Sequence, residues 1–334
     1  MPNNQAAGAA SSVIEVRGLE KRFGAIEAVR GIDLEVKRGE IFGFLGPNGA
    51  GKSTTINMLC TLLKPTGGVA RVAGFDVAKE PNEVRARLGL VFQDPSLDIQ
   101  LTARENLEFH AFLYRVPSSE RDARIDEVLD MVQLTDRADS LVMTYSGGMK
   151  RRLEIARGML HTPEVLFLDE PTIGLDTQTR RHIWGYLNDL PKQKGVTIFM
   201  TTHYMEEAEF CDRIAIIDHG EIQAIGTPEE LKSMVGGDVV TISTADNEAA
   251  APLVEAIAGS APLSVDGSLT VEVSNAAAFV PKLVRELTVE VNSVAFHRPS
   301  LDDVFLKLTG RQIRAEEADA KDQARAMVGA WRRR

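Results

Sequence analysis

The first two thirds of the chain contain two different patterns of hydrophobic and polar residues. Residues 102–157 show the spacing of amphipathic helices. Apolar runs with the length of buried strands occur at residues 40–45, 165–168, 196–200 and 214–217. Because strand-like and helical segments alternate, we predict an α/β domain over residues 13–236, with a helical subdomain at about 94–157.

A different pattern begins after the glycine pair at residues 236 and 237. The expected order there is strand, helix, hairpin, helix, strand, which is the order of the ferredoxin-like split unit. We therefore predict a small α+β domain over residues 237–310. From its position in the chain and by analogy, we assign this domain to regulation or dimer contacts. Residues 1–12 are interpreted as a flexible leader without the features of a signal peptide. Residues 311–334 are interpreted as a charged tail whose arginines are solvated or, as the alternative, touch anionic lipid.

Composition narrows the class of protein. The chain has 334 residues, of which 44% are hydrophobic and 26% charged, which is typical of a soluble globular protein with about two domains. It contains no apolar run of about 18 residues, so we expect no membrane span. A net charge of −10 argues against broad nucleic-acid binding. The two cysteines, Cys60 and Cys211, stand far apart in apolar surroundings and favour a reduced, cytosolic protein.

The first chemical motif is a glycine-rich loop between a predicted strand and a predicted helix. It matches the phosphate-binding pattern G-x-x-x-x-G-K-[ST]. Such a loop turns successive N–H groups toward a phosphate, and the following helix adds the positive end of its dipole. The Lys52 side chain is expected to reach the terminal phosphates, and the Ser53 hydroxyl to bind Mg²⁺. The nucleotide-binding residues predicted here are Gly46, Pro47, Asn48, Gly49, Ala50, Gly51, Lys52, Ser53 and Thr54.

A second motif favours hydrolysis of the bound nucleotide. Residues 165–168 form an apolar strand that delivers two adjacent carboxylates, Asp169 and Glu170, at its carboxyl end, where α/β sheets bind their ligands. Asp169 suits the Walker-B role of holding Mg²⁺, and Glu170 suits the role of polarising the attacking water. Alone, the pair is equally a strand end with two solvated acids. Together with the phosphate loop, it indicates phosphoryl transfer.

A third motif lies at the start of a predicted basic amphipathic helix, which comes just before the predicted strand at residues 165–168. Ser146 is a natural N-cap, and Gly147 and Gly148 leave the helix terminus open to an anion.

With these motifs in this order, residues 13–235 resemble the ATP-binding subunit of an ABC transporter. That resemblance implies a P-loop ATPase domain with a mixed sheet core and a helical subdomain, which uses ATP and Mg²⁺. By the same resemblance, Phe23 stacks on adenine, Gln93 is the Q-loop residue that senses Mg²⁺, and Ser146 to Gly148 form the signature loop. Asp176 matches the D-loop and His203 the switch histidine that contacts the γ-phosphate, although His203 taken alone is more often a satisfied histidine at a strand end. Phe23 and Met149 stand where the family usually has Tyr and Gln.

The resemblance also implies partners. The signature loop of one subunit completes the ATP site of a second, so one set of motifs implies a dimer, expected to be a homodimer. A separate multi-span permease is expected to dock near Gln93 and residues 94–145, which places the chain at the cytoplasmic face of the membrane.

Residues 297–310 resemble the C-terminal signature of the daunorubicin-resistance-like branch of ABC-2 type exporters, in which Gln often replaces His203. Export of drugs or lipophilic compounds is the leading interpretation. Export of polysaccharide or lipid, a soluble ABC ATPase outside transport, and a module that binds ATP without splitting it are the alternatives. Glu170 argues against the last.

Overall fold

The computed structural model describes residues 12–93, 96–265 and 267–310, and the chain divides into two compact units between Ile225 and Gly226. The sequence pattern places the change of domain near residue 236. The structural division comes earlier because α8 (Pro228–Ser233) packs against α11 (Leu301–Thr309) inside the second unit. The two units are described separately.

An antiparallel sheet begins the first unit. Its strand order is β2-β1-β4-β5. The long strands β1 and β2 alternate buried apolar and exposed polar residues, as a half-buried sheet requires. The bounds are Ser12–Phe23 (β1), Ile26–Lys37 (β2), Gly67–Val72 (β4) and Phe75–Asp76 (β5).

A second, six-stranded sheet has the order β10-β9-β3-β8-β7-β6, and its strands from β9 to β6 pair in parallel. The central strands β3, β7 and β8 are buried along their whole length, which explains their continuous apolar sequences. The bounds are Ile41–Leu45 (β3), Leu88–Val91 (β6), Val165–Asp169 (β7), Thr197–Thr202 (β8), Arg213–Asp218 (β9) and Glu221–Gly226 (β10).

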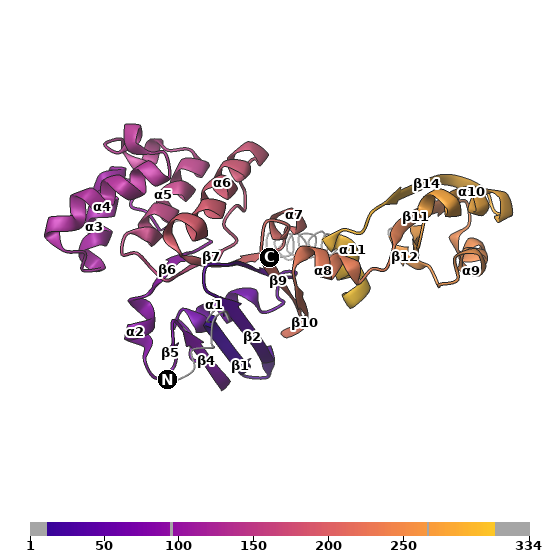
Figure 1. Ribbon diagram of the computed structural model, residues 1–334, viewed down its shortest axis with the longest axis horizontal. Helices are drawn as coiled ribbons and strands as arrows, with labels where there is room; N and C mark the ends of the chain where they lie inside the picture. Colours follow the sequence, from indigo (N-terminus) through magenta and orange to yellow (C-terminus); the bar gives the residue numbers. More distant parts are fainter. Residues whose placement is uncertain (1–11, 94–95, 266, 311–334) are drawn as a thin grey trace, which may run out of the picture. The chain divides into compact units, whose positions relative to one another are not determined.

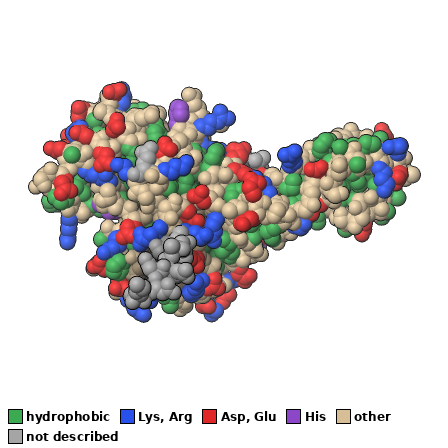
Figure 2. Space-filling model, viewed as in Figure 1, with side chains coloured by type: hydrophobic (Ala, Val, Ile, Leu, Met, Phe, Trp, Pro, Cys, Tyr) green, Lys and Arg blue, Asp and Glu red, His purple; other side chains and the backbone are tan. Residues whose placement is uncertain are grey.

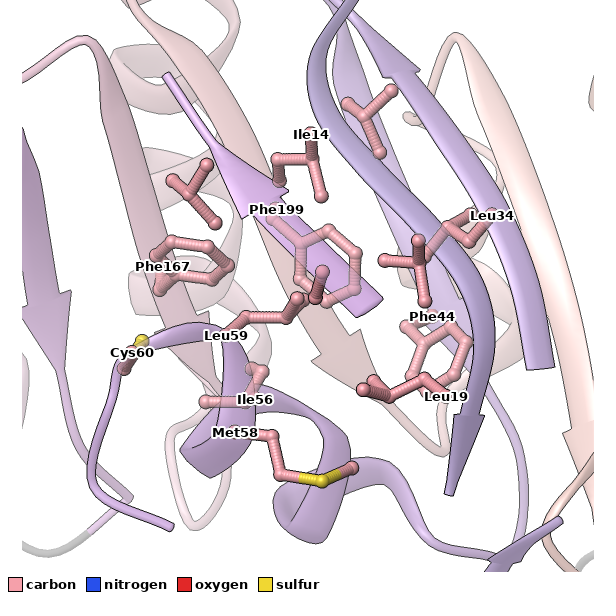
Figure 3. Close-up of a cluster of buried hydrophobic side chains, with 14 of the residues drawn as sticks. Ile14, Leu19, Leu34, Phe44, Ile56, Met58, Leu59, Cys60, Phe167 and Phe199 are labelled. Atoms are coloured by element: carbon pink, nitrogen blue, oxygen red, sulfur yellow. The ribbon is translucent and has the colours of Figure 1, made fainter. Parts of the chain in front are cut away.

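The main core lies between these two sheets, around helix α1 (Lys52–Leu59). Figure 3 shows Ile56, Met58 and Leu59 of α1 beside Phe44, Phe167 and Phe199 of the parallel sheet and beside residues of β1 and β2. All of these side chains are buried. The packing fixes the N-terminus of α1 at the carboxyl end of β3.

Helices supply the rest of the first unit. The segment from α3 to α5 confirms the helical pattern of residues 102–157 and projects from the sheets in Figure 1. A capping box between Thr102 and Glu105 begins α3. The bounds are Pro81–Arg85 (α2), Ala103–Leu113 (α3), Ser118–Met131 (α4), Gly147–Met159 (α5), Thr177–Lys194 (α6) and Met205–Ala208 (α7).

The second unit is an antiparallel sheet of order β12-β13-β11-β14 with two helices packed on it. Its elements run β11-α9-β12-β13-α10-β14, which is the ferredoxin-like order expected from the sequence. Its core gathers residues such as Val240, Val254, Val271 and Leu283. The bounds are Asp238–Thr244 (β11), Asn247–Ala258 (α9), Leu263–Val265 (β12), Ser268–Val273 (β13), Ala276–Glu286 (α10) and Val291–His297 (β14).

The surface carries both signs of charge. In Figure 2, acidic and basic side chains are interspersed on the visible face of each unit. Across residues 12–93, 96–265 and 267–310, none of the helices is both long and apolar enough to cross a bilayer.

Candidate functional site

The glycine-rich loop connects β3 to α1, and its backbone leaves no room for side chains at two glycines. A Cβ at Gly46 would lie 2.3 Å from the carbonyl oxygen of Ile217, and one at Gly51 would lie 2.6 Å from that of Ala28. Gly51 also has a φ of 106°, in the left-handed region. The loop therefore requires glycine at both positions to bring its N–H groups around the start of α1.

The Lys52 side chain is buried in this loop. Its Nζ donates hydrogen bonds to the carbonyl oxygens of Gly46 (2.7 Å) and Pro47 (3.0 Å) and lies 3.7 Å from Oε1 of Glu170. The ammonium is thus held next to the catalytic carboxylate expected from the sequence.

Oxygen ligands for a divalent cation converge at the carboxyl end of β7. Oδ1 of Asp169 accepts hydrogen bonds from Thr201 Oγ1 (2.5 Å) and Ser53 Oγ (3.4 Å). Carboxylate and hydroxyl oxygens suit Mg²⁺, which takes most of its other ligands from water and substrate phosphates. In the part of the chain that the structure describes, no cluster of three or more His, Cys, Asp or Glu residues forms a separate metal cage. The residues present fit a nucleotide-bound Mg²⁺.

Glu170 is held in an unusual conformation. Its φ is 46°, and its N–H donates to Thr201 Oγ1 (3.1 Å). Its Oε1 lies 3.2 Å from Nδ1 of His203, at the end of β8. Burial raises the pKa of Glu170, but the hydrogen bond from His203 and the charges of His203 and Lys52 outweigh it, so the pKa is lowered. The carboxylate is therefore ionised at neutral pH and able to accept a proton.

A cavity of about 230 Å³ joins three of the motifs. The phosphate loop and the first turn of α1 form one side of it, and Gln93 and Glu170 lie on its wall. Segments that are 40 to 120 residues apart in sequence thus meet in one place, as the parallel sheet predicts.

Three expected nucleotide-binding elements do not line this cavity. Ser146 caps α5 through the N–H of Met149 (3.2 Å), and Asp176 caps α6 through the N–H of Thr179 (2.9 Å). The starts of α5 and α6 are close together, as the space around Gly148 shows: a Cβ at this residue would lie 2.2 Å from the Thr179 side chain. Phe23, at the end of β1, is half-exposed, with Lys21 Nζ 5.0 Å from its ring centre.

Sequence reasoning missed several residues that hold the site together. Thr201 orients both Asp169 and the backbone of Glu170. The buried carboxylate of Glu207 accepts hydrogen bonds from the hydroxyls of Thr202 and Thr172. Burial raises the pKa of Glu207, although Thr202 and Arg180 partly oppose this shift. The only signal in the sequence was the position of Thr201 and Thr202 just before His203.

Comparisons with known proteins agree with this geometry. Residues 29–173 match the family model described as ABC transporter. A daunorubicin resistance ATP-binding protein of Streptomyces coeruleorubidus is 41% identical over 320 residues, which are 93% of this chain and 98% of that protein. The chain belongs to the family of ABC transporter ATP-binding proteins. The predicted ATPase fold and activity are confirmed.

Further comparisons extend the similarity to the second unit and to solved structures. Residues 226–309 match the model described as ATP-binding protein DrrA1-3-like, C-terminal domain, so the expected branch of the ABC family is confirmed as well. A linearmycin resistance ATP-binding protein of Bacillus subtilis is 40% identical over 90% of this chain and 100% of its own length. A dimeric ATP-binding cassette solved with ADP and Pi is 32% identical, with a TM-score of 0.58, over 64% of this chain and 98% of that one.

Proposed function

We propose that this ABC ATPase hydrolyses MgATP in a dimer and drives a separate membrane permease that exports drugs or lipophilic compounds. The observation that carries the proposal is the cavity shared by the phosphate loop, Gln93 and Glu170. It combines a phosphate cradle with an ionised carboxylate, which are two of the parts that hydrolysis of a phosphoanhydride needs.

The motif residues in and around the cavity each have a part in the proposed reaction. The backbone N–H groups of residues 48–54 and the Lys52 ammonium bind the phosphates, while Ser53, Asp169 and Gln93 would hold Mg²⁺. The metal ion supplies neutralisation of phosphate charge when it is bound. Glu170 accepts a proton from the attacking water, and His203 orients Glu170 and contacts the γ-phosphate.

The signature and D-loop residues explain why a dimer is needed. Ser146, Gly147, Gly148 and Asp176 lie together, but they do not line the cavity of their own chain. In a head-to-tail pair they would close the nucleotide site of the other subunit. The similar cassette solved with ADP and Pi is described as dimeric, which supports the formation of a pair. Phe23, whose ring is half-exposed, would stack on the adenine, as the family resemblance implies.

An exposed apolar surface lies in the segment where we expect the permease. The N–H of Met143 donates to the carbonyl oxygen of Ile99 (2.9 Å), so the two segments that carry these exposed side chains are adjacent. Leu141, which is also exposed, is close to Met143 in sequence. A cytosolic helix of the permease would cover these residues, and it would hold the ATPase at the cytoplasmic face of the membrane.

The cargo class is supported by the relatives' names, which include resistance to daunorubicin and to linearmycin. We also propose that residues 13–236 form the ATPase domain and residues 237–310 a regulatory or dimer-contact domain. Co-expression of the chain with a candidate multi-span permease tests the cargo. Resistance to amphiphilic drugs that depends on Glu170 is expected, and resistance that survives Glu170→Gln would contradict the proposal.

A further inference from the structure

The side chain of Arg151, in the second turn of α5, is buried beneath the catalytic turn. It is 7% exposed, and its hydrogen bonds go to main-chain carbonyl oxygens. Nε donates to Pro171 (2.6 Å), and Nη2 donates to Asp169 (3.1 Å) and Glu170 (3.3 Å). Nη1 donates to Phe92, the residue before Gln93. One guanidinium thus joins the catalytic turn to the start of the Q-loop.

This arrangement is costly for stability alone. Burial disfavours the charged guanidinium and lowers the pKa of Arg151 to about 10, although the nearby carboxylates of Glu154 and Asp169 oppose the shift. Arg151 therefore stays charged at neutral pH. Buried charges of this kind are often no more stabilising than apolar residues of the same size. The geometry that Arg151 imposes is a better reason for its presence.

The groups that Arg151 holds are those that must be placed accurately for hydrolysis. Glu170 has a left-handed backbone conformation, which persists only where its surroundings enforce it. Thr201 binds the N–H of Glu170, and Arg151 binds its carbonyl oxygen. Moreover, Arg151 lies one turn beyond the signature loop, whose Ser146 caps the same helix.

We propose that Arg151 is a positioning residue that couples the signature helix to Gln93 and Glu170, so that a displacement of α5 moves both together. The inference rests on the proposed roles of those residues. Arg151 does not line the nucleotide cavity, so it acts on the rate of hydrolysis and leaves ATP affinity unchanged.

The test compares Arg151→Gln with Arg152→Gln in the full chain. Arg152 is on the same helix and also donates to carbonyl oxygens, those of Val132 (2.9 Å) and Gln133 (3.3 Å), but both lie in the helical subdomain. Steady-state ATP hydrolysis, binding of a fluorescent ATP analogue and the melting temperature are measured for each. We expect Arg151→Gln to lower kcat by about 10- to 100-fold, the cost of misplacing reacting groups by about 1 Å.

Binding of the ATP analogue to Arg151→Gln should stay within about threefold of the parent, because the phosphate cradle is intact. Arg151→Lys keeps the charge with fewer and differently directed donors, so its kcat should lie between those of the parent and Arg151→Gln. If Arg151→Gln does not fold, Arg151→Lys serves as the deciding variant. Arg152→Gln should lower the melting temperature while retaining kcat within about twofold.

The proposal is overturned if the Arg151 variants retain the parent kcat, or if Arg152→Gln loses as much kcat as Arg151→Gln. It is also overturned if the Arg151 variants lose ATP affinity in proportion to kcat. Glu170→Gln is measured in parallel. Parent-like hydrolysis by that variant would refute the assignment of the catalytic base, which is a different failure from an unaltered kcat in Arg151→Gln.

Discussion

The two units of this protein bury different kinds of residues. In the first unit, several buried charged groups lie around the ends of β7 and β8, and they include Lys52, Arg151, Asp169, Glu170 and Glu207. In the second unit, among its described residues, Thr244 is the single buried polar side chain. The second unit is an ordinary apolar core between one sheet face and two helices.

We interpret this difference as a separation of roles, in which the first unit contains the groups that react and the core of the second unit contributes to folding. Buried charges cost free energy unless they are paired, so the first unit gives up stability to hold groups in place for reaction. Among its described residues the second unit has no buried charged groups, so mutations in its apolar core should affect folding and leave the chemical step unchanged. Four predictions test this separation, beginning with the largest expected effect.

Lys52→Ala should weaken ATP binding by about 10³-fold, because it removes the buried ammonium that would face the phosphates. Isothermal titration with ATP measures the change. The matched control is Lys79→Ala, since the Lys79 side chain is 80% exposed, pairs with Asp76 (3.6 Å) and does not line the nucleotide cavity. Equal ATP affinity in parent and Lys52→Ala would contradict the phosphate cradle.

Leu283→Ala in α10 should destabilise the second unit by about 2–5 kcal/mol, because it opens a cavity in an apolar core. The kcat of the folded protein should not change. The neighbouring Val284 is 56% exposed, so Val284→Ala should cost less than about 0.5 kcal/mol. Chemical denaturation and ATP hydrolysis are measured on the same samples. A loss of kcat in folded Leu283→Ala would contradict the prediction that the core of the second unit affects folding and not hydrolysis.

Phe23→Ala should weaken ATP binding by roughly 1–2 kcal/mol, the scale of stacking between a base and an aromatic ring. Phe23→Tyr should retain the affinity, because the ring is kept. Competition of ATP with inorganic triphosphate sharpens this test, since triphosphate affinity should be the same in all three proteins. A triphosphate affinity that falls as far as ATP affinity would rule out stacking as the cause.

Acid should destabilise the first unit through His110. Burial and the charge of Arg157 lower the pKa of His110 from 6.5 to about 4, so the folded state favours the neutral ring. Its stabilising contribution is therefore complete above pH 6.5 and is lost as the pH falls toward 4. His110 is only partly buried, and after solvent screening we expect a loss of about 1 kcal/mol. Denaturation at pH 7 and pH 4.5 should show a smaller loss for His110→Phe than for the parent.

Much of the nucleotide cavity was predictable from sequence because its constraints are local. Gly46 and Gly51 have no room for a Cβ, and a glycine pattern between a strand and a helix reports such positions directly. The apolar run before Asp169 likewise predicts a buried strand with a carboxylate at its end.

The supporting residues were not predictable, because their partners are far away in sequence. Arg151 meets carbonyl oxygens 18 to 59 residues away, and main-chain oxygens carry no sequence signal. The hydroxyl of Thr201 on β8 donates to the Asp169 carboxylate at the end of the neighbouring strand β7, and this partner is also far away in sequence. The left-handed backbone of Glu170 was also hidden, since glycine usually marks such a conformation.

The most direct test of the account is Mg²⁺-dependent ATP hydrolysis per chain, measured over a wide range of protein concentration for the parent and for Glu170→Gln. The account predicts that turnover per chain of the parent rises with concentration as dimers form, and that Glu170→Gln binds ATP without turnover. Turnover that is independent of concentration, or parent-like hydrolysis by Glu170→Gln, would contradict it.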